Sequence, residues 1–210
     1  MHTLTQLNQI TGGLSAPSKM PCQSYSIPAQ ACLTGSKFVD VAGSVCEGCY
    51  ALQGNYRFPS VKLKQSVRLE SLGRPDWVEA MASLISMTES SGFFRWHDSG
   101  DLQSVDHLRA IAGVCRLTPH IRHWLPTREY SIVGDYLTAG ETIPDNLTVR
   151  LSAYMIDGEP PLAIAARYGV QASTVTRGQA SCPASQQGNK CLTCRACWDR
   201  SVPVVSYRKH

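Results

Sequence analysis

The chain has 210 residues, of which 43% are hydrophobic and 17% are charged. This composition is ordinary for a globular protein and excludes wholesale disorder. A formal charge of +4, from 20 basic and 16 acidic residues, does not by itself indicate nucleic-acid binding. Residues 1–13 lack the basic start and apolar run of a signal peptide, and no stretch is apolar enough to span a bilayer. We therefore expect one domain over residues 1–210, cytoplasmic and without a membrane partner.

The N-terminal part of the chain predicts a cysteine-rich loop rather than regular structure. Residues 17–59 are rich in Gly, Pro, Ser and Cys and show no sustained helical or strand periodicity. A loop of this length in a globular domain needs a ligand or function to keep it ordered.

Residues 60–178 predict alternating helices and strands. Two helices, 60–72 and 75–90, precede the first clear strand at 93–96. Then follow a helix at 104–117, a strand at 121–125, a helix at 130–139, a strand at 147–151, a helix at 162–168 and a strand at 172–176. The strands recur at the length of a right-handed parallel crossover unit.

This order predicts an α/β fold, either a partial (β/α) barrel or an open parallel sheet. We favour the partial barrel, because the chain is short for a complete eight-unit barrel of about 250 residues. The cysteine-rich segments on either side of the repeats, 17–59 and 179–201, would then meet at one end of it.

Nine cysteines in a reducing compartment indicate metal binding or redox chemistry rather than a disulfide framework. Cys115 is set apart, because it falls on the apolar face of its helix together with Val105, Leu108 and Ala112. We predict that it packs in the core as a small hydrophobe.

The C-terminal cysteines carry the strongest signal in the sequence. Cys191, Cys194 and Cys197 are spaced C-x2-C-x2-C, which matches the first three ligands of the bacterial ferredoxin run. No cysteine follows at the ferredoxin position, so Cys182 is predicted as the fourth ligand. The sequence favours a [4Fe-4S] cluster here, with structural zinc as the alternative. Four nearby basic residues would partly compensate the negative charge of such a cluster: Arg177, Lys190, Arg195 and Arg200.

A second set of thiols precedes the first helix. Cys46 and Cys49 form a C-x2-C pair, with Cys22 and Cys32 upstream. Long, unequal gaps are compatible with zinc or with a cluster, since loop closure brings in the distant ligands. We predict a second metal centre from these four cysteines, either [4Fe-4S] or Zn.

Polar residues follow the predicted strands, at the edge where parallel α/β folds bind ligands. They are His97, Asp98 and Asp101 after the first strand, Arg128 after the second and Tyr154 after the third. A carboxylate would accept from hydroxyl or amino groups of a small molecule, and a guanidinium would clamp a carboxylate or phosphate. The competing interpretation is structural: an Asp–Arg pair across strands and an Asp cap on the following helix.

Four segments together resemble a phage and prophage protein family known by its mycobacteriophage member, gene product eighty-eight. They are Lys19–Cys22, Cys46–Ala51, Phe94–Asp101 and Cys191–Trp198. The resemblance implies a phage-associated protein with metal-binding cysteines, expressed in a bacterial host.

The layout of an α/β scaffold with cysteine-ligated clusters also resembles the radical S-adenosylmethionine superfamily, whose enzymes commonly use C-x3-C-x2-C. That spacing is absent from both cysteine groups, so the resemblance does not carry S-adenosylmethionine binding over to this chain.

Three functions follow as hypotheses. The first is an iron-sulfur protein on a radical-enzyme-like scaffold, with a small molecule or redox partner at the strand ends. The second is a non-enzymatic electron carrier or cluster-dependent sensor. The third is a zinc-stabilised module that binds nucleic acid, which the slight basic excess supports only weakly.

Overall fold

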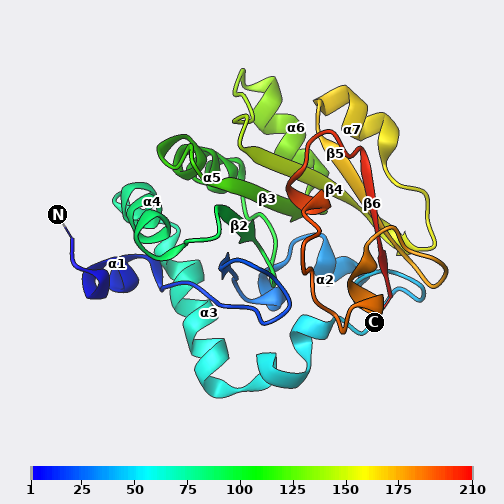
Figure 1. Cartoon of the computed structure of the whole chain (residues 1–210), viewed down its shortest axis with the longest axis horizontal. Helices are drawn as coiled ribbons and strands as arrows, with labels where there is room; N and C mark the ends of the chain where they lie inside the picture. The colour runs from blue at the N-terminus through cyan, green and yellow to red at the C-terminus, as the bar shows by residue number, and fades with distance from the viewer. Residues whose placement is uncertain (1, 210) are drawn as a thin grey trace.

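The computed structural model describes residues 2–209 and contains one parallel sheet of six strands. The strands are β1 (Ser24–Tyr25), β2 (Phe93–Trp96), β3 (Arg122–Thr127), β4 (Leu147–Ile156), β5 (Gln171–Thr176) and β6 (Val204–Arg208). They lie side by side in chain order, and all five pairings are parallel. Among the described strands β1 and β6 are the two edges, so the sheet is open (Figure 1). The predicted α/β class is confirmed, but the favoured partial barrel is wrong: the described strands β1 and β6 do not pair, so the sheet is the open parallel alternative.

Seven α-helices are described. They are α1 (Leu4–Thr11), α2 (Gly35–Phe38), α3 (Pro59–Ser71), α4 (Trp77–Thr88), α5 (Val105–Leu117), α6 (Tyr130–Thr138) and α7 (Leu162–Tyr168). Local chemistry sets several of their ends. Pro59 starts α3 with its φ already helical, Ser104 caps α5 by accepting from the His107 N–H, and Gly169 ends α7 in the left-handed conformation.

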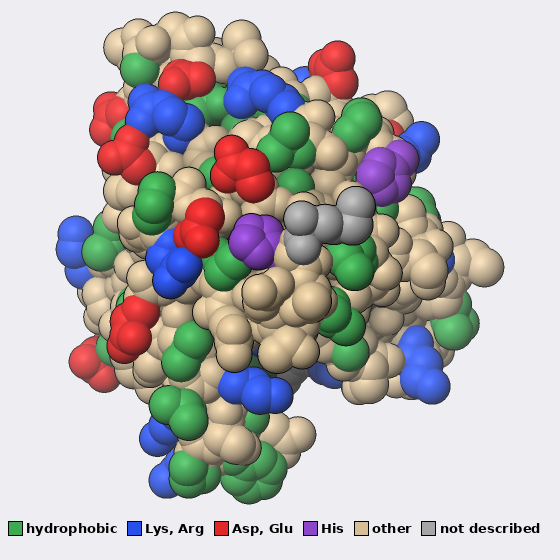
Figure 2. Space-filling view, turned by 90° about the vertical axis from the view of Figure 1, so that its left-hand side faces the viewer, with side chains coloured by type: hydrophobic (Ala, Val, Ile, Leu, Met, Phe, Trp, Pro, Cys, Tyr) green, Lys and Arg blue, Asp and Glu red, His purple; other side chains and the backbone are tan. Residues whose placement is uncertain are grey.

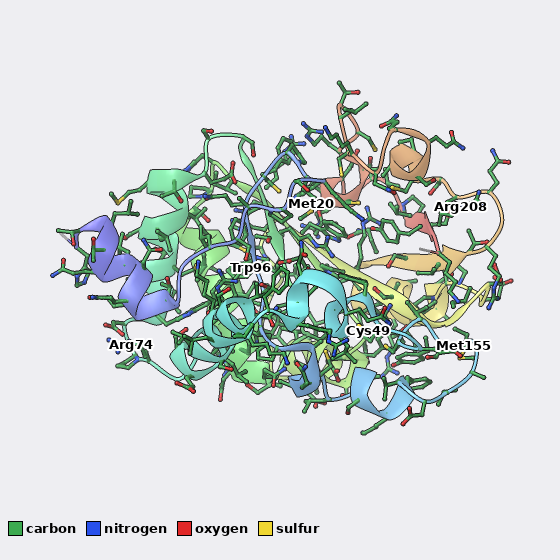
Figure 3. All side chains as sticks on the ribbon, turned by 90° about the horizontal axis from the view of Figure 1, so that it is seen from below. Met20, Cys49, Arg74, Trp96, Met155 and Arg208 are labelled. Carbon is green, nitrogen blue, oxygen red and sulfur yellow. The ribbon has the colours of Figure 1, made fainter. Side chains whose placement is uncertain are left out.

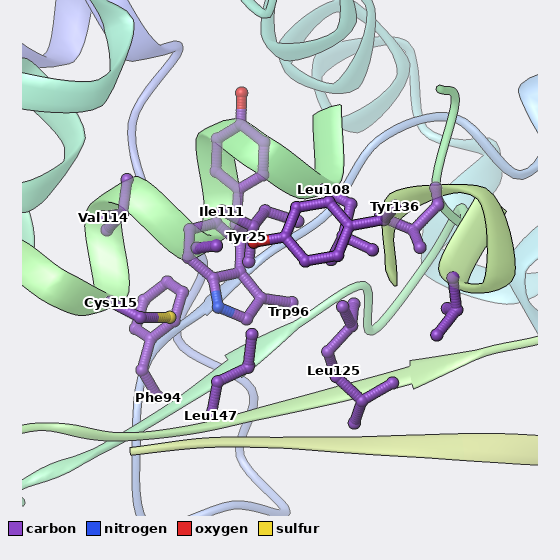
Figure 4. Packing of buried hydrophobic residues seen from close by; sticks show 14 of the residues in the cluster. Tyr25, Phe94, Trp96, Leu108, Ile111, Val114, Cys115, Leu125, Tyr136 and Leu147 are labelled. Atoms are coloured by element: carbon purple, nitrogen blue, oxygen red, sulfur yellow. The ribbon is translucent and has the colours of Figure 1, made fainter. Parts of the chain in front are cut away.

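One face of the sheet is covered by helices and forms the main core. Because right-handed crossovers join strands in sequential order, the connecting helices all fall on the same side. Phe94, Trp96 and Leu125 point into this core from the strands, and α4, α5, α6 and α7 supply the opposing apolar faces (Figure 4). Cys115 lies among them fully buried, as the helical pattern predicts.

The opposite face carries a second, smaller apolar cluster and several polar side chains. Trp124 of β3 and Val205 of β6 pack there with Trp198 of the C-terminal segment. Arg95 of β2 lies in register with Trp124, so its side chain emerges on this same face. The C-terminal segment therefore covers the face that the helices leave free.

The N-terminal cysteine-rich loop contains only short helical turns between β1 and α3. They are η1 (Ala29–Ala31), α2, η2 (Tyr50–Leu52) and η3 (Gly54–Arg57). Further turns in the C-terminal segment are η4 (Pro183–Gln186) and η5 (Ala196–Trp198). Both cysteine-rich segments are thus ordered loops, as their composition predicts.

Two histidines are buried in the core, and one of them, His107, differs from the sequence prediction. His107 was expected on the solvated side of its helix but is buried beside His97, with ring centroids 5.1 Å apart. His123 is fully buried and stacks on Trp96, and its Nε2 lies 2.8 Å from the Thr118 hydroxyl. The helical pattern placed His107 with Asp106 on the solvated side of its helix, and this prediction is wrong because the His107 ring packs against His97.

Charged side chains are mixed on the face of the molecule that Figure 2 shows, where acidic, basic and apolar groups are interspersed. Among residues 2–209, no helix has both the length and the apolar character needed to cross a bilayer.

Candidate metal centre

Five cysteines from distant parts of the chain gather against the sheet face that carries no helices. This five-thiol group consists of Cys22, Cys182, Cys191, Cys194 and Cys197. Cys22 and Cys197 are buried in the second apolar cluster, and Cys182 packs against it. The Cys191 N–H donates to the carbonyl oxygen of Lys19 over 2.9 Å, which ties the C-terminal loop to the segment carrying Cys22. Met20 lies beside the C-terminal segment in Figure 3.

Arg150 of β4 fixes the C-terminal segment to the sheet. Its guanidinium is fully buried, and each of its five N–H groups donates to a backbone carbonyl oxygen. The acceptors are Ala172 (3.3 Å), Ala196 (2.6 Å), Cys197 (3.1 Å), Asp199 (2.8 Å) and Val202 (3.0 Å). Four of the five belong to the segment around the last cysteine, so Arg150 sets where that cysteine lies.

Arg95 lies near the same thiols, but not all of its N–H groups have a hydrogen-bond acceptor. Its guanidinium lies over the Trp124 ring, 4.5 Å from the centroid, and Nη1 approaches the Met20 sulfur at 3.5 Å. Its Nε is buried and has no hydrogen-bond partner, and Arg95 forms no ion pair with any residue in 2–209. A buried guanidinium nitrogen without an acceptor is costly, so this geometry calls for an anion beside it.

Burial shifts the pKa of the two most buried thiols of the five-thiol group, Cys22 and Cys197, upward. Burial raises the pKa of Cys22 to about 12, with Glu89 and Cys191 adding to the effect and Arg95 opposing it. Burial also raises the pKa of Cys197 to about 12, although the Tyr207 hydroxyl, 3.2 Å from its sulfur, favours the thiolate. A soft cation would displace the thiol protons on binding, which couples metal affinity to pH.

A second group of thiols lies over the carboxyl ends of β2 and β3. This three-thiol group consists of Cys32, Cys46 and Cys49. The Cys49 N–H donates to the Cys46 carbonyl oxygen over 3.1 Å, which makes the tight turn typical of C-x2-C ligands. Burial raises the pKa of Cys32 to about 12, with Asp101 and both other thiols contributing. Figure 3 shows Cys49 on this loop, apart from Met20 and the C-terminal segment.

The loop that carries the three-thiol group is tethered to the strand ends. Both oxygens of buried Glu129 accept from Thr34, from its N–H at 2.8 Å and its hydroxyl at 2.7 Å. The Gln103 side chain donates to the Ala31 carbonyl over 3.1 Å, and the Val45 N–H donates to Tyr154 over 2.8 Å. Residues 31–45 are therefore held in place although they contain little regular structure.

The carboxylates of the two strand-end aspartates both accept hydrogen bonds within the protein. Asp101 Oδ1 accepts from the Leu102 N–H and the Thr127 hydroxyl, and Oδ2 accepts from the Arg128 N–H over 2.9 Å. Burial raises the pKa of Asp101 to about 6 despite these bonds. The helix cap that the sequence assigned to Asp101 is made by Ser104 instead.

Each carboxylate oxygen of Asp98 also accepts a hydrogen bond within the protein. One of its oxygens accepts from the Ser24 hydroxyl at 2.7 Å, the other from the Tyr56 hydroxyl at 3.1 Å, and its carbonyl oxygen accepts from the Tyr50 hydroxyl. These bonds join the N-terminal loop to β1 and β2.

The other three predicted strand-end residues differ in how many of their polar atoms form hydrogen bonds. They are His97, Arg128 and Tyr154. His97 is buried in the left-handed backbone conformation (φ 53°), and neither ring nitrogen has a partner. Burial, with His107 and Arg95, holds the pKa of His97 well below its usual range. Tyr154 donates to the Arg128 carbonyl over 3.2 Å and stacks between Phe38 and Tyr130. The Arg128 Nε is buried without a partner.

The structure regroups the predicted ligands and adds residues that the sequence did not indicate. Cys22 was predicted with Cys32, Cys46 and Cys49, but it lies with the C-terminal cysteines. Arg150 belongs to no motif, and Arg95 lies within the family segment Phe94–Asp101 but was not singled out there; their charge within apolar strands was the signal that could have marked them. Within residues 2–209, no three Cys, His, Asp or Glu side chains stand close enough to hold a single metal ion as they are placed.

The fold and the two thiol groups define an α/β protein with an open parallel sheet and cysteine-rich loops on it. The chain belongs to the Gene product 88 family, a phage protein family whose sequence model matches residues 2–200. This confirms the phage-family resemblance of the sequence motifs. No curated protein and no solved structure matches the chain.

Proposed function

We propose that this phage-family protein binds a [4Fe-4S] cluster through the five-thiol group. Cys191, Cys194 and Cys197 supply three ligands with the C-x2-C-x2-C spacing, and Cys182 supplies the fourth. Cys22 lies beside them as a fifth thiol. The observation that carries the proposal is the convergence of these thiols next to a guanidinium whose buried Nε has no acceptor.

The residues present fit such a cluster in donor type and in charge. Thiolates are the ligands that iron-sulfur clusters take, and a cluster held by four of them carries net negative charge. Arg95 supplies the positive charge that a buried anion requires, near Cys22, Cys191 and Cys197. The apolar cluster around Trp124 and Trp198 keeps the site partly dry, which strengthens this interaction.

When bound, the cluster would supply one-electron redox chemistry. The protein contributes position and electrostatics: Arg150 holds the ligand segment, and the Tyr207 hydroxyl lies 3.2 Å from the Cys197 sulfur. Because Asp98 and Asp101 are occupied in structural hydrogen bonds, electron transfer or redox sensing is the function supported best. A radical reaction at the strand ends stays a prediction, as do a redox partner and a small-molecule substrate.

The test is a metal analysis of the full chain purified anaerobically. Iron, acid-labile sulfide and zinc are measured per chain, with the visible absorption spectrum. We expect at least about four iron matched by sulfide, reduced by about four in the double variant Cys191→Ala, Cys194→Ala. Cys115→Ala is the matched control, since that thiol lies in the core, and it keeps the iron of the wild type.

Zinc is the competing occupant. Zinc without sulfide in a colourless protein would overturn the proposal. Salt-sensitive binding of that zinc form to DNA or RNA would then select the nucleic-acid module.

A further inference from the structure

Two cysteines of the three-thiol group, Cys32 and Cys46, lie beside a space that Gly35 leaves open, and Cys49 is close to both. A Cβ atom at Gly35 would lie 3.0 Å from the Cys32 Cβ, 3.5 Å from the Cys46 Sγ and 3.7 Å from the Cys32 Sγ. The backbone of Gly35 is not in the left-handed region, so its conformation does not require glycine. The missing side chain instead keeps clear the space beside two sulfurs.

The acidic residues next to these thiols are already used. Both oxygens of Glu129 bind Thr34, and both oxygens of Asp101 accept protein hydrogen bonds. Cys22, the fourth thiol in the sequence prediction, lies in the five-thiol group. Among residues 2–209 the group therefore offers three sulfurs and no free carboxylate.

Arg128 stands beside this group with an unused donor. Its N–H donates to Asp101 and its carbonyl oxygen accepts from Tyr154, so its backbone is fixed on both sides. Its Nε is buried without a partner, and it forms no ion pair within residues 2–209. The guanidinium also lies close enough to Cys46 to favour its thiolate. A planar guanidinium with free donors is suited to a carboxylate.

We infer that Cys32, Cys46 and Cys49 hold a second iron-sulfur cluster with one iron free of cysteine, and that a small carboxylate binds between this iron and Arg128. Three thiolates on a cubane leave one iron to be ligated from elsewhere. One carboxylate oxygen would coordinate that iron, and the carboxylate would accept a hydrogen bond from the unpartnered Arg128 Nε. The inference extends the proposed function to a second site of the same chemistry.

The first test counts clusters with two sets of variants. We expect about eight iron per chain in the wild type. We expect about four in the triple variant, which combines Cys32→Ala, Cys46→Ala and Cys49→Ala, and about four in the double variant, which combines Cys191→Ala and Cys194→Ala. Equal iron in the wild type and the triple variant would overturn the inference and leave the proposed function standing. Iron lost in the triple variant but not in the double variant would support the inference and overturn the proposed function.

A glycine pair tests the site without removing a ligand. Gly35→Ala places a methyl group against the two sulfurs and should halve the iron content. Gly73→Ala is the matched control, because no atom lies within 4 Å of its Cβ position, and it should keep the full content. The added methyl group lies 3.0 Å from the Cys32 Cβ and requires a small local shift, so circular dichroism and urea unfolding check that the fold is kept. Full iron in Gly35→Ala would contradict the assigned space.

The open iron is tested with acetate labelled with ¹³C at the carboxyl group. Pulsed electron-nuclear double resonance on the reduced Cys191→Ala, Cys194→Ala protein should show ¹³C coupling, and Arg128→Gln in that background should weaken acetate binding at least tenfold. If the double variant does not fold, the wild type is compared with the triple variant. Coupling absent, or unchanged by Arg128→Gln, would overturn the carboxylate site.

Discussion

The two thiol groups use the same chemistry on different supports. The five-thiol group lies against the sheet, where Arg150 binds five carbonyl oxygens and Trp198 donates to the Phe94 carbonyl over 2.8 Å. The three-thiol group lies on a loop held by the side chains of Glu129 and Gln103 and by backbone hydrogen bonds to β4. In each group an arginine with a buried, unpartnered Nε lies near the thiols: Arg95 near the five-thiol group and Arg128 near the three-thiol group.

This difference separates what the fold fixes from what a ligand must order. A segment bound to a rigid strand through four of its carbonyls has little conformational freedom left to lose. A loop of about 30 residues between β1 and α3 retains more freedom and gains more from a bound metal. We therefore expect the five-thiol group to be the better organised of the two before metal binds.

The largest effect is expected from Arg150→Met, which removes the clamp but keeps an apolar side chain. Five buried carbonyl oxygens would lose their donor, at a cost of about 3–5 kcal/mol in the free energy of unfolding. Urea unfolding of the metal-free protein measures it. Arg150→Lys keeps the charge and some of the donors, so its free energy of unfolding should lie between those of Arg150→Met and the wild type. A loss below about 1 kcal/mol in Arg150→Met would show that the segment is held by other contacts.

The next largest effect is expected from replacing either arginine whose buried Nε has no hydrogen-bond partner, Arg95 or Arg128. A positive charge about 6 Å from a cluster favours its reduced form by roughly 100 mV at an effective dielectric constant of 20. Arg95→Gln should therefore lower the midpoint potential of the five-thiol cluster by about that amount. Redox titration followed by electron paramagnetic resonance measures the shift.

Arg128→Gln is the crossed control for that titration. It should leave the potential of the five-thiol cluster within a few tens of millivolts of the wild type, because distance and solvent weaken its influence there. Equal shifts in Arg95→Gln and Arg128→Gln would mean that the two arginines do not serve separate centres.

A smaller effect is expected from Glu129→Gln, which weakens the tether of the N-terminal loop. An amide oxygen still accepts one bond from Thr34, but the charge-assisted pair is lost, at about 1–2 kcal/mol. Iron retention during dilution into chelator should fall roughly five- to thirtyfold for the three-thiol centre alone. Faster loss from both centres would indicate general destabilisation of the fold.

The sequence predicted the repeats well because period and turn signals act over short distances. All four predicted strands and the five helices between residues 59 and 168 are present, with ends shifted by a few residues. The strand β1 has only two residues and lies inside a cysteine-rich loop, so no alternation was visible. For β6, the run Val204–Arg208 follows the last predicted loop and pairs only because the C-terminal segment returns to β5.

The site was less accessible to such reasoning. C-x2-C spacing identified the ligand-rich segments, but which thiols meet depends on chain crossings that spacing does not encode. Cys22 joins the C-terminal cysteines because the segment before β1 runs along the Cys191 loop. Arg95 could have been noticed as a charge within the strand Phe93–Trp96, yet whether its donors are paired is a property of the folded chain alone.

The smallest effect is expected from Tyr207→Phe, which removes one hydroxyl and leaves the ring stacked near Trp124. Burial, with Cys197, holds the pKa of Tyr207 well above its usual range, so at neutral pH the hydroxyl keeps its proton and donates to a ligating sulfur. A donor to that sulfur stabilises the reduced cluster, and its loss should lower the potential by roughly 20–30 mV, which corresponds to about 0.5–0.7 kcal/mol. The shift should be confined to the five-thiol centre, as for Arg95→Gln but several times smaller. An unchanged potential with full iron content would mean that the Cys197 sulfur does not ligate the cluster, and the fifth thiol, Cys22, would then be the replacement ligand to test.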